Sequence, residues 1–198
     1  MNTPVSLPRT RPRAITPHRP EQDPACAGCP QLGLLRALRR CGIEAAGRLG
    51  CEPGEALLLA DLARGQARVR ILAGPGEPDR RLLPPGVAVA RLDPADLHAT
   101  EMALWRALSH PGDTLFLAIT PCVLSGPRLA PLQVAEPRCN RCGSCLTLAC
   151  PAVGEGEEAM VIDEAVCTGC GLCVPLCRGR AIGPALQVVT WGPGSDDR

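Results

Sequence analysis

The sequence predicts an α+β fold, in which a small α/β layer precedes a cysteine-rich module. Segments of strand and helix type alternate over the first two thirds of the chain, and Pro127 and Pro131 mark a break before the cysteines become dense. The chain has 198 residues with 13 cysteines, one Phe, two Trp and no Tyr. A core so poor in aromatic side chains needs other support, which bound metal can supply in small modules.

The first predicted helix follows a segment without hydrophobic periodicity. Residues 1–23 are rich in Pro and Arg, and we expect them to form a disordered tail. A helix is predicted from Pro30, because Leu34, Leu38 and Cys41 recur at helical spacing and Gly42 offers a stop.

Three strands and a second helix are predicted to complete the α/β layer. The strands are expected over 66–73, 87–92 and 114–120, the last of which delivers Cys122 just past its end. The helix lies before the third strand and runs from Asp93 to about Ser109. Its expected N-cap is Asp93, followed by Pro94 at the first helical position. Its expected apolar face carries Leu97, Leu104, Trp105 and Leu108.

Eight cysteines in the last third form two tight runs. The runs are Cys139-x2-Cys142-x2-Cys145-x4-Cys150 and Cys167-x2-Cys170-x2-Cys173-x3-Cys177. This spacing is typical of bacterial ferredoxins with two [4Fe–4S] clusters, in which the last cysteine of each run ligates the cluster of the other run. The predicted ligands are therefore Cys139, Cys142, Cys145 and Cys177 for one cluster, and Cys167, Cys170, Cys173 and Cys150 for the other. The alternative is structural zinc, which prefers paired C-x2-C knuckles.

The chain resembles the alpha subunit of indolepyruvate ferredoxin oxidoreductase, of the 2-oxoacid:ferredoxin oxidoreductase superfamily. The resemblance is carried by the ferredoxin runs and by three upstream segments. Cys26-Ala-Gly-Cys29-Pro30 is similar to the start of that family's thiamine-diphosphate domain, Gly47-Arg-Leu-Gly50-Cys51 to a Gly-Asp-Ile-Gly-Cys segment, and Thr120-Pro121-Cys122 to an Arg-Pro-Cys segment. It covers about 24 to 190, with a large internal deletion.

The resemblance implies a third [4Fe–4S] cluster, whose ligands would be Cys26, Cys29, Cys51 and Cys122. The alternative is a set of buried structural thiols, because free cysteine is among the most buried residue types. Cys41 is left over and is expected to pack in the core beside Leu34 and Leu38. The chain is thus expected to have three regions: the tail at 1–23, a region at 24–130 that the resemblance implies is a shrunken remnant of a thiamine-diphosphate-binding domain, and a two-cluster ferredoxin-like domain at 131–198.

The resemblance also shows what the chain lacks. The family binds Mg-thiamine diphosphate through a Gly-Asp-Gly stretch and a later Asn, which supply the oxygen ligands that Mg²⁺ requires. Here Gly112-Asp113-Thr114 lacks the second Gly, and the two asparagines are Asn2 in the tail and Asn140 between cluster cysteines. We therefore expect no thiamine diphosphate and no catalytic residue. We expect His98 and His110 to be solvated.

These inferences predict a non-catalytic electron-transfer subunit that relays single electrons through two or three clusters. Its partner would be a larger oxidoreductase or a soluble ferredoxin. Two alternatives are a 2-oxoacid oxidoreductase subunit whose thiamine site lies on another chain, and a redox sensor or assembly factor. The net charge of +1 gives no case for nucleic acid, and no apolar run is long enough to span a membrane. Metal-type cysteine spacing without a secretory signal predicts the cytoplasm.

Overall fold

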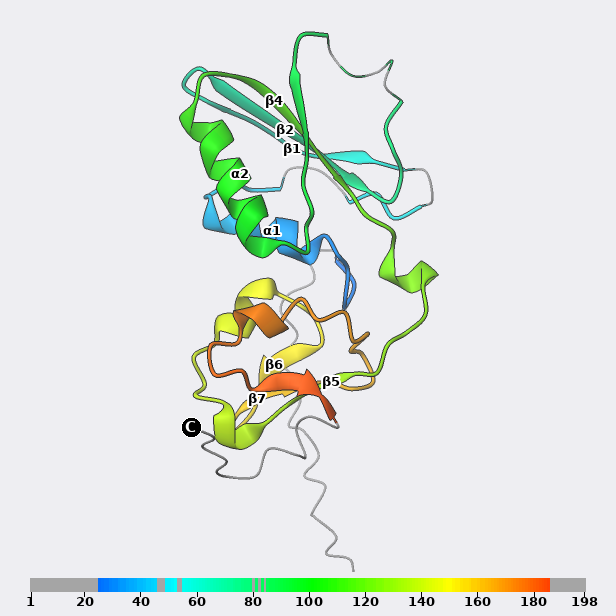
Figure 1. The fold of residues 1–198 in the computed structure, drawn as a ribbon, viewed down its shortest axis with the longest axis vertical. Helices are drawn as coiled ribbons and strands as arrows, with labels where there is room; N and C mark the ends of the chain where they lie inside the picture. Colours follow the sequence, from blue (N-terminus) through cyan, green and yellow to red (C-terminus); the bar gives the residue numbers. More distant parts are fainter. Residues whose placement is uncertain are drawn as a thin grey trace, which may run out of the picture.

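A computed structural model describes residues 25–45, 49–52, 55–79, 81, 83 and 85–185. The tail expected at 1–23 lies outside the described residues. Figure 1 shows two parts, one above the other: a sheet with helix α2 along it, and a cysteine-rich part built from short strands and single turns. Helix α1 lies between the two parts (Figure 1). Within the described residues no helix is long and apolar enough to cross a membrane.

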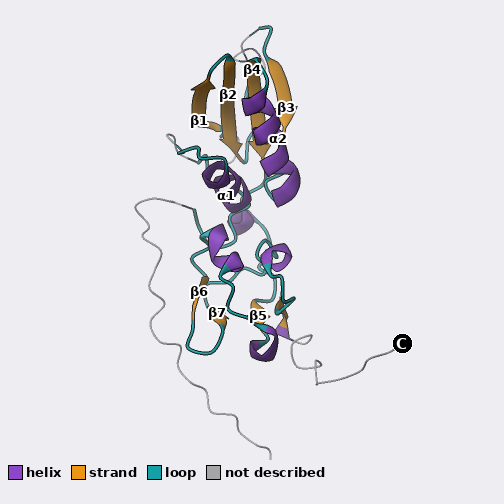
Figure 2. Ribbon diagram, turned by 90° about the vertical axis from the view of Figure 1, so that its left-hand side faces the viewer, coloured by secondary structure: helices purple, strands orange, loops and turns teal. Residues whose placement is uncertain are grey.

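Four strands make up the sheet of the upper part (Figure 2). In spatial order they are β1 (Leu57–Arg64), β2 (Ala67–Gly74), β4 (Gly112–Ile119) and β3 (Ala88–Arg91). β1 is antiparallel to β2, whereas β2 and β3 both run parallel to β4. The predictions for β2, β3 and β4 are confirmed to within two residues at each end. The continuous burial of Leu115 to Ala118 in β4 is typical of a parallel strand covered on both faces.

β1 is absent from the strands predicted above. Its Leu- and Ala-rich sequence has good intrinsic helix propensity, so local preference points away from a strand. Pairing decides its state, because β1 forms a ladder with β2 from Leu57 opposite Ala73 to Arg64 opposite Ala67. The two-residue connection uses Gly65 at φ +59°, and Asp61 accepts hydrogen bonds of 3.0 and 2.8 Å from Arg68.

The first helix, α1 (Leu32–Arg40), is confirmed, although it begins two residues after Pro30, where it was predicted to start. It ends next to Gly42, which adopts φ +69° and leaves the Ile43 amide bonded to the Leu38 carbonyl at 2.9 Å. Gly33 marks its closest approach to the segment before the second helix, since a Cβ added there would overlap the Pro94 carbonyl oxygen. Only glycine allows the two backbones to meet at this point.

The second helix, α2 (Leu97–Ser109), differs from its prediction at two places. It begins at Leu97 because Asp96 is the N-cap and accepts a hydrogen bond of 2.9 Å from the Ala99 amide. Asp93 instead accepts from the Ala95 amide at 2.9 Å and closes a turn. Trp105 is 44% exposed, so its predicted place on the apolar face is wrong. The other three predicted members of that face, Leu97, Leu104 and Leu108, are buried.

The cysteine-rich part has two small antiparallel sheets. One pairs β5 (Leu132–Val134) with β8 (Ile182–Pro184), and the other pairs β6 (Val153–Glu155) with β7 (Met160–Ile162). The cysteine loops between these strands contain the 3-10 turns η3 (Glu136–Arg138), η4 (Ser144–Leu148) and η5 (Val174–Leu176). A fourth such turn, η2 (Val123–Ser125), lies in the connection from β4.

One hydrophobic core runs through both parts. Leu32 and Leu38 of α1 belong to the same buried cluster as Leu148, Leu172 and Ile182 of the cysteine-rich part. Cys41 was predicted to pack in the core, and it is instead half-buried and packs against the outside of this core. The observed structure is therefore a mixed α/β fold with few helices, in which α1 joins the sheet to the cysteine loops.

Candidate iron–sulfur sites

The first predicted ligand set comes together in the structure. Burial raises the pKa of the Cys145 thiol, and the charges of the nearby Cys177, Cys139 and Cys142 thiolates raise it further. Cys177 belongs to the second run, so the chain crosses between the runs as the ferredoxin pattern predicts. Cys142 is exposed while Cys145 is buried, so this set reaches from the core to the surface.

The second predicted set also comes together. The pKa of Cys173 is raised to about 12, mainly by burial and in smaller part by the charges of Cys170, Cys150 and Cys167. The pKa of Cys150 is raised by its burial and by the charges of Cys170 and Cys167. Cys150 comes from the first run, so the exchange of fourth cysteines is reciprocal. Cys170 is the exposed member of this set.

Backbone amides point at the sulfur atoms of both sets. The Met160 amide donates to Cys139 Sγ at 3.4 Å, and the Ala181 amide donates to Cys177 Sγ at 3.1 Å. Cys167 Sγ accepts from the amides of Leu132 at 3.5 Å and Gly169 at 3.4 Å. Amide donors of this kind compensate the negative charge of a thiolate ligand and tune the potential of a bound cluster.

The third quartet is assembled at one edge of the sheet. Because β2 and β4 are parallel, their carboxyl ends lie at the same edge. The chain leaving β4 leads to Cys122, and the segment that carries Cys51 docks there through the Gly50 amide, which donates to the Ala73 carbonyl at 3.2 Å.

Gln31 brings the remaining pair, Cys26 and Cys29, to the same edge. Its side-chain amide is buried and donates to the Ala118 carbonyl at 2.7 Å and to Thr120 Oγ1 at 3.0 Å. This fixes the start of α1, and with it the preceding Cys26–Cys29 loop, against the end of β4. Gln31 was not singled out from the sequence, where nothing distinguishes it from a surface residue.

Cys29 feels the charges of the other three thiols of the third quartet. The pKa of Cys29 is raised to about 11, mainly by burial and in smaller part by the charges of Cys26, Cys51 and Cys122. Cys26 and Cys51 are exposed, while Cys29 and Cys122 are half-buried. The three segments that carry these thiols are thus neighbours in space although 96 residues separate the first cysteine from the last.

The donor set fits iron–sulfur clusters. Each group offers four soft thiolate donors, which suit iron, and each is built from separate loops that can surround a cube. Gly143, Gly169 and Gly171 adopt φ values of +68°, +74° and +82°, which let the loops turn tightly about the sulfurs. Among the described residues, no three His, Cys, Asp or Glu side chains converge on a single metal-ion position.

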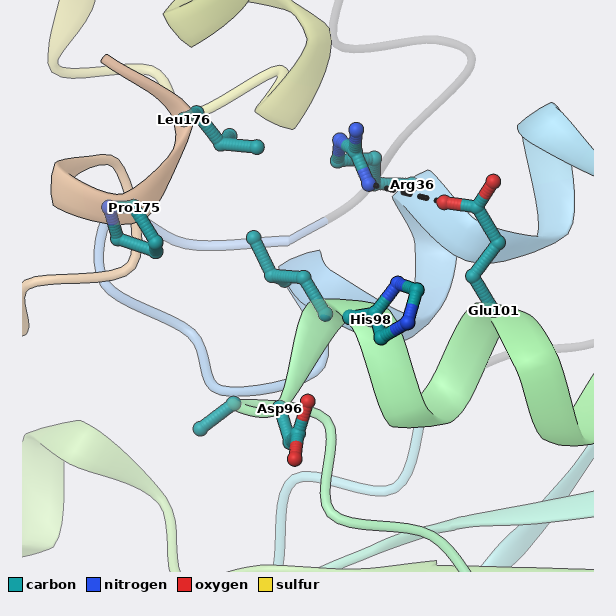
Figure 3. A pocket seen from close by; sticks show the side chains of 8 residues that line it. Arg36, Asp96, His98, Glu101, Pro175 and Leu176 are labelled. Carbon is teal, nitrogen blue, oxygen red and sulfur yellow. Dashed lines mark hydrogen bonds and ion pairs between the residues drawn. The ribbon is translucent and has the colours of Figure 1, made fainter. Parts of the chain in front are cut away.

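Other candidate groups lie away from these thiols. His98 and His110 are exposed, as expected. Gly112-Asp113-Thr114 begins β4, at the end of the strand opposite to Cys122. A cavity of about 430 Å³ lies between α1, the start of α2 and η5 (Figure 3). Its charged groups already have partners in the chain, since Arg36 pairs with Glu101 at 3.4 Å.

Comparisons with known proteins identify the cysteine-rich part. Residues 160–183 match the family described as "4Fe-4S binding domain". This segment is therefore similar to a 4Fe–4S binding domain, which supports an iron–sulfur electron-transfer role. No solved structure matches the chain.

The particular relatives are subunits of one oxidoreductase. The chain is 34% identical over 99 residues to the indolepyruvate oxidoreductase subunit IorA of Methanothermobacter marburgensis. It is 33% identical over 102 residues to the IorA of Archaeoglobus fulgidus. Each match covers 48% of this chain but 16% of the relative. Over about half of its length the chain is thus a homologue of IorA, and it spans about one sixth of the length of these relatives.

Proposed function

We propose that this chain is a non-catalytic subunit that relays single electrons through three [4Fe–4S] clusters to or from a partner oxidoreductase. The observation that carries the proposal is the grouping of twelve of the 13 cysteines into three sets of four, each held together from distant segments. Neither disulfide bonds nor isolated structural thiols would explain why the cysteines group into three sets of four.

The proposal assigns each set to one cluster. Cys139, Cys142, Cys145 and Cys177 would hold the first cluster, and Cys167, Cys170, Cys173 and Cys150 the second. Cys26, Cys29, Cys51 and Cys122 would hold the third. Residues 131–198 would form the two-cluster domain, and residues 24–130 would be a reduced thiamine-domain remnant whose role is to carry the third cluster and to dock a partner.

Iron and acid-labile sulfide per chain test this assignment after anaerobic purification. Three clusters of four irons give about 12 irons per chain. Replacing Cys51 by Ser should remove about four of them, since a site with three thiolates holds a cubane poorly. Cys41→Ser is the matched control, because Cys41 is the cysteine outside the three sets, and it should keep all the iron. About 8 irons in the unmodified chain, or full iron in Cys51→Ser, would overturn the third cluster.

The match to IorA favours a second candidate, in which the chain belongs to a 2-oxoacid oxidoreductase whose thiamine site lies on another chain. This candidate predicts that the chain captures a thiamine-diphosphate-binding partner and that the mixture reduces clusters when a 2-oxoacid is added. Cluster reduction that needs no thiamine diphosphate would reject it in favour of the relay alone.

A further inference from the structure

The side chain of Glu55 folds back on the segment that carries Cys51. Its carboxylate oxygen Oε2 accepts hydrogen bonds of 3.0 Å from the Cys51 amide and of 3.4 Å from the Glu52 amide. The Glu55 amide donates in turn to the Glu52 carbonyl at 3.0 Å. The two amides held by the carboxylate lie on either side of the Cα of Cys51. One side chain therefore fixes both peptide groups that set the direction of the Cys51 thiol.

The backbone of Glu55 is itself anchored to the end of β2. The Gly76 amide donates to the Glu55 carbonyl at 2.9 Å, and a Cβ added at Gly74 would overlap the same carbonyl oxygen. Glycine at the last position of β2 thus allows Glu55 to approach the sheet closely. On the other side of Cys51, the Gly50 amide donates to the Ala73 carbonyl at 3.2 Å. The segment that carries Cys51 is therefore tied to β2 both before and after the cysteine.

The same end of β2 also holds the segment that leads to Cys122. The Thr120 amide donates to the Gly74 carbonyl at 3.1 Å, and Cys122 follows two residues later. Gly74 therefore contacts the backbone of both Glu55 and Thr120. The position of the Cys51 thiol relative to Cys122 depends on this contact and on the carboxylate that links Glu55 to Cys51.

Cys51 needs such a link more than the ligands of the two ferredoxin runs do. Each of those runs carries three cysteines two residues apart, so a single loop fixes their relative positions. The nearest cysteine of the third quartet, Cys29, lies 22 residues before Cys51. Cys51 is also exposed, so core packing contributes little to its orientation. The hydrogen bonds of Glu55 supply a local constraint that cysteine spacing and burial do not.

We propose that Glu55 positions Cys51 as a ligand of the third cluster and that the negative charge of Glu55 lowers the potential of that cluster. This inference rests on the proposed three-cluster function. Reduction adds one electron, delivered by a one-electron redox partner protein, to an already negative site. A nearby carboxylate therefore disfavours the reduced state. Glu55 is half-buried, so solvent screens its charge less than that of an exposed side chain.

Two substitutions separate the positioning role of Glu55 from the effect of its charge. Glu55→Gln keeps a side-chain oxygen that can accept from the Cys51 and Glu52 amides, but it removes the charge. Glu55→Ala removes both the hydrogen bonds and the charge. Each variant is purified anaerobically as the holoprotein. Iron and acid-labile sulfide per chain are measured, and a redox titration is followed by EPR.

Glu55→Gln should keep about 12 irons per chain and raise the potential of the third cluster. The third-cluster signal is identified as the one that Cys51→Ser abolishes. Glu55→Ala should retain only about 8 irons, because Cys51 is no longer held as the fourth ligand. The signals of the two ferredoxin clusters should remain in Glu55→Ala, which shows that the chain has folded.

Glu52→Gln is the matched control, since it removes a carboxylate next to Cys51 but leaves the amide of residue 52 and the side chain of Glu55 in place. Glu52 is exposed, so Glu52→Gln should keep all the iron and shift the third potential less than Glu55→Gln does.

About 12 irons in Glu55→Ala would overturn the positioning role. An unmoved third potential in Glu55→Gln, or an equal shift in Glu52→Gln, would overturn the role of the charge. Glu55→Gln keeps the test decisive if Glu55→Ala does not fold. These outcomes leave the three-cluster function intact, whereas about 8 irons in the unmodified protein would overturn both it and the role of Glu55.

Discussion

Amide groups and one arginine set the electrostatic surroundings of the cysteines. The high pKa values of Cys29, about 11, and Cys173, about 12, mean that these thiols hold their protons at neutral pH in the metal-free protein. Cluster insertion must displace those protons, because the thiolate is the ligand. The proposed clusters would therefore be what makes the buried thiolate form of these cysteines favourable.

Arg178 follows Cys177 at a position where ferredoxin runs usually carry Pro. Its positive charge contributes to lowering the pKa of Cys142, after larger effects of hydrogen bonds to Ser144. In the proposed assignment, the same charge would favour the reduced state of the first cluster. We predict that Arg178→Gln lowers the first-cluster potential, by on the order of tens of millivolts. EPR-monitored redox titration measures this potential, and Arg180→Gln, at another exposed arginine, is the control. Equal shifts of the potential in the two variants would refute a specific role of Arg178.

At the scale of helices and strands, the sequence predicted the elements whose formation depends on local hydrophobic patterns and turn residues. The α1 periodicity with its Gly42 stop and the apolar strands β2, β3 and β4 were predictable. β1 was not, because Leu57 to Arg64 is a strand only through its partner β2. The start of α2 was misplaced because Asp93 and Asp96 are both possible N-caps, and their hydrogen bonds alone tell which one starts the helix.

The candidate sites likewise combine features that local sequence patterns predict with features that only contacts between distant segments reveal. Cysteine spacing alone predicts which thiols of the two runs share a set, and the structure brings those thiols together. The third quartet required a family resemblance, since no local spacing relates Cys29 to Cys51 or Cys122. The contact of Gly28 with Thr168 joins residues 140 positions apart and was beyond any local pattern.

Gln31 is the side chain that ties α1 to β4. We predict that Gln31→Ala lowers the free energy of unfolding by about 1–3 kcal/mol, because the buried Ala118 carbonyl loses a hydrogen-bond donor. Urea unfolding of the holoprotein measures the loss. Gln133→Ala is the control, since Gln133 donates to Glu164 at the surface and should change stability by less than about 0.5 kcal/mol. Equal losses in the two variants would contradict the anchoring role.

Across the whole molecule, α1 connects the sheet to the cysteine loops. Arg36 on α1 donates to Thr147 of η4 at 3.1 Å and to Glu101 of α2 at 3.4 Å, and its side chain is 12% exposed. Arg40 binds the same Glu101 at 2.7 Å, but its side chain is 54% exposed. Arg36 therefore makes a contact between the two parts, whereas Arg40 makes only an ion pair at the surface.

We predict that Arg36→Met lowers the free energy of unfolding by about 1–3 kcal/mol, because it removes both the hydrogen bond to Thr147 in the cysteine-rich part and the partly buried one to Glu101 of α2. Arg40→Met should cause no measurable loss, since solvent screens an exposed ion pair. Thermal unfolding of the two holoproteins, with iron content checked, compares them. A loss from Arg40→Met as large as that from Arg36→Met would show that Arg36 does not link the parts.

The central claim is that the chain carries three one-electron centres. Anaerobic coulometric titration of the purified holoprotein measures it most directly, by counting the electrons taken up per chain as the potential is lowered. Each [4Fe–4S] cluster accepts one electron, so the account predicts about three electrons per chain, within the broad range of potentials that such clusters span. Uptake of about two electrons by fully iron-loaded protein would contradict it.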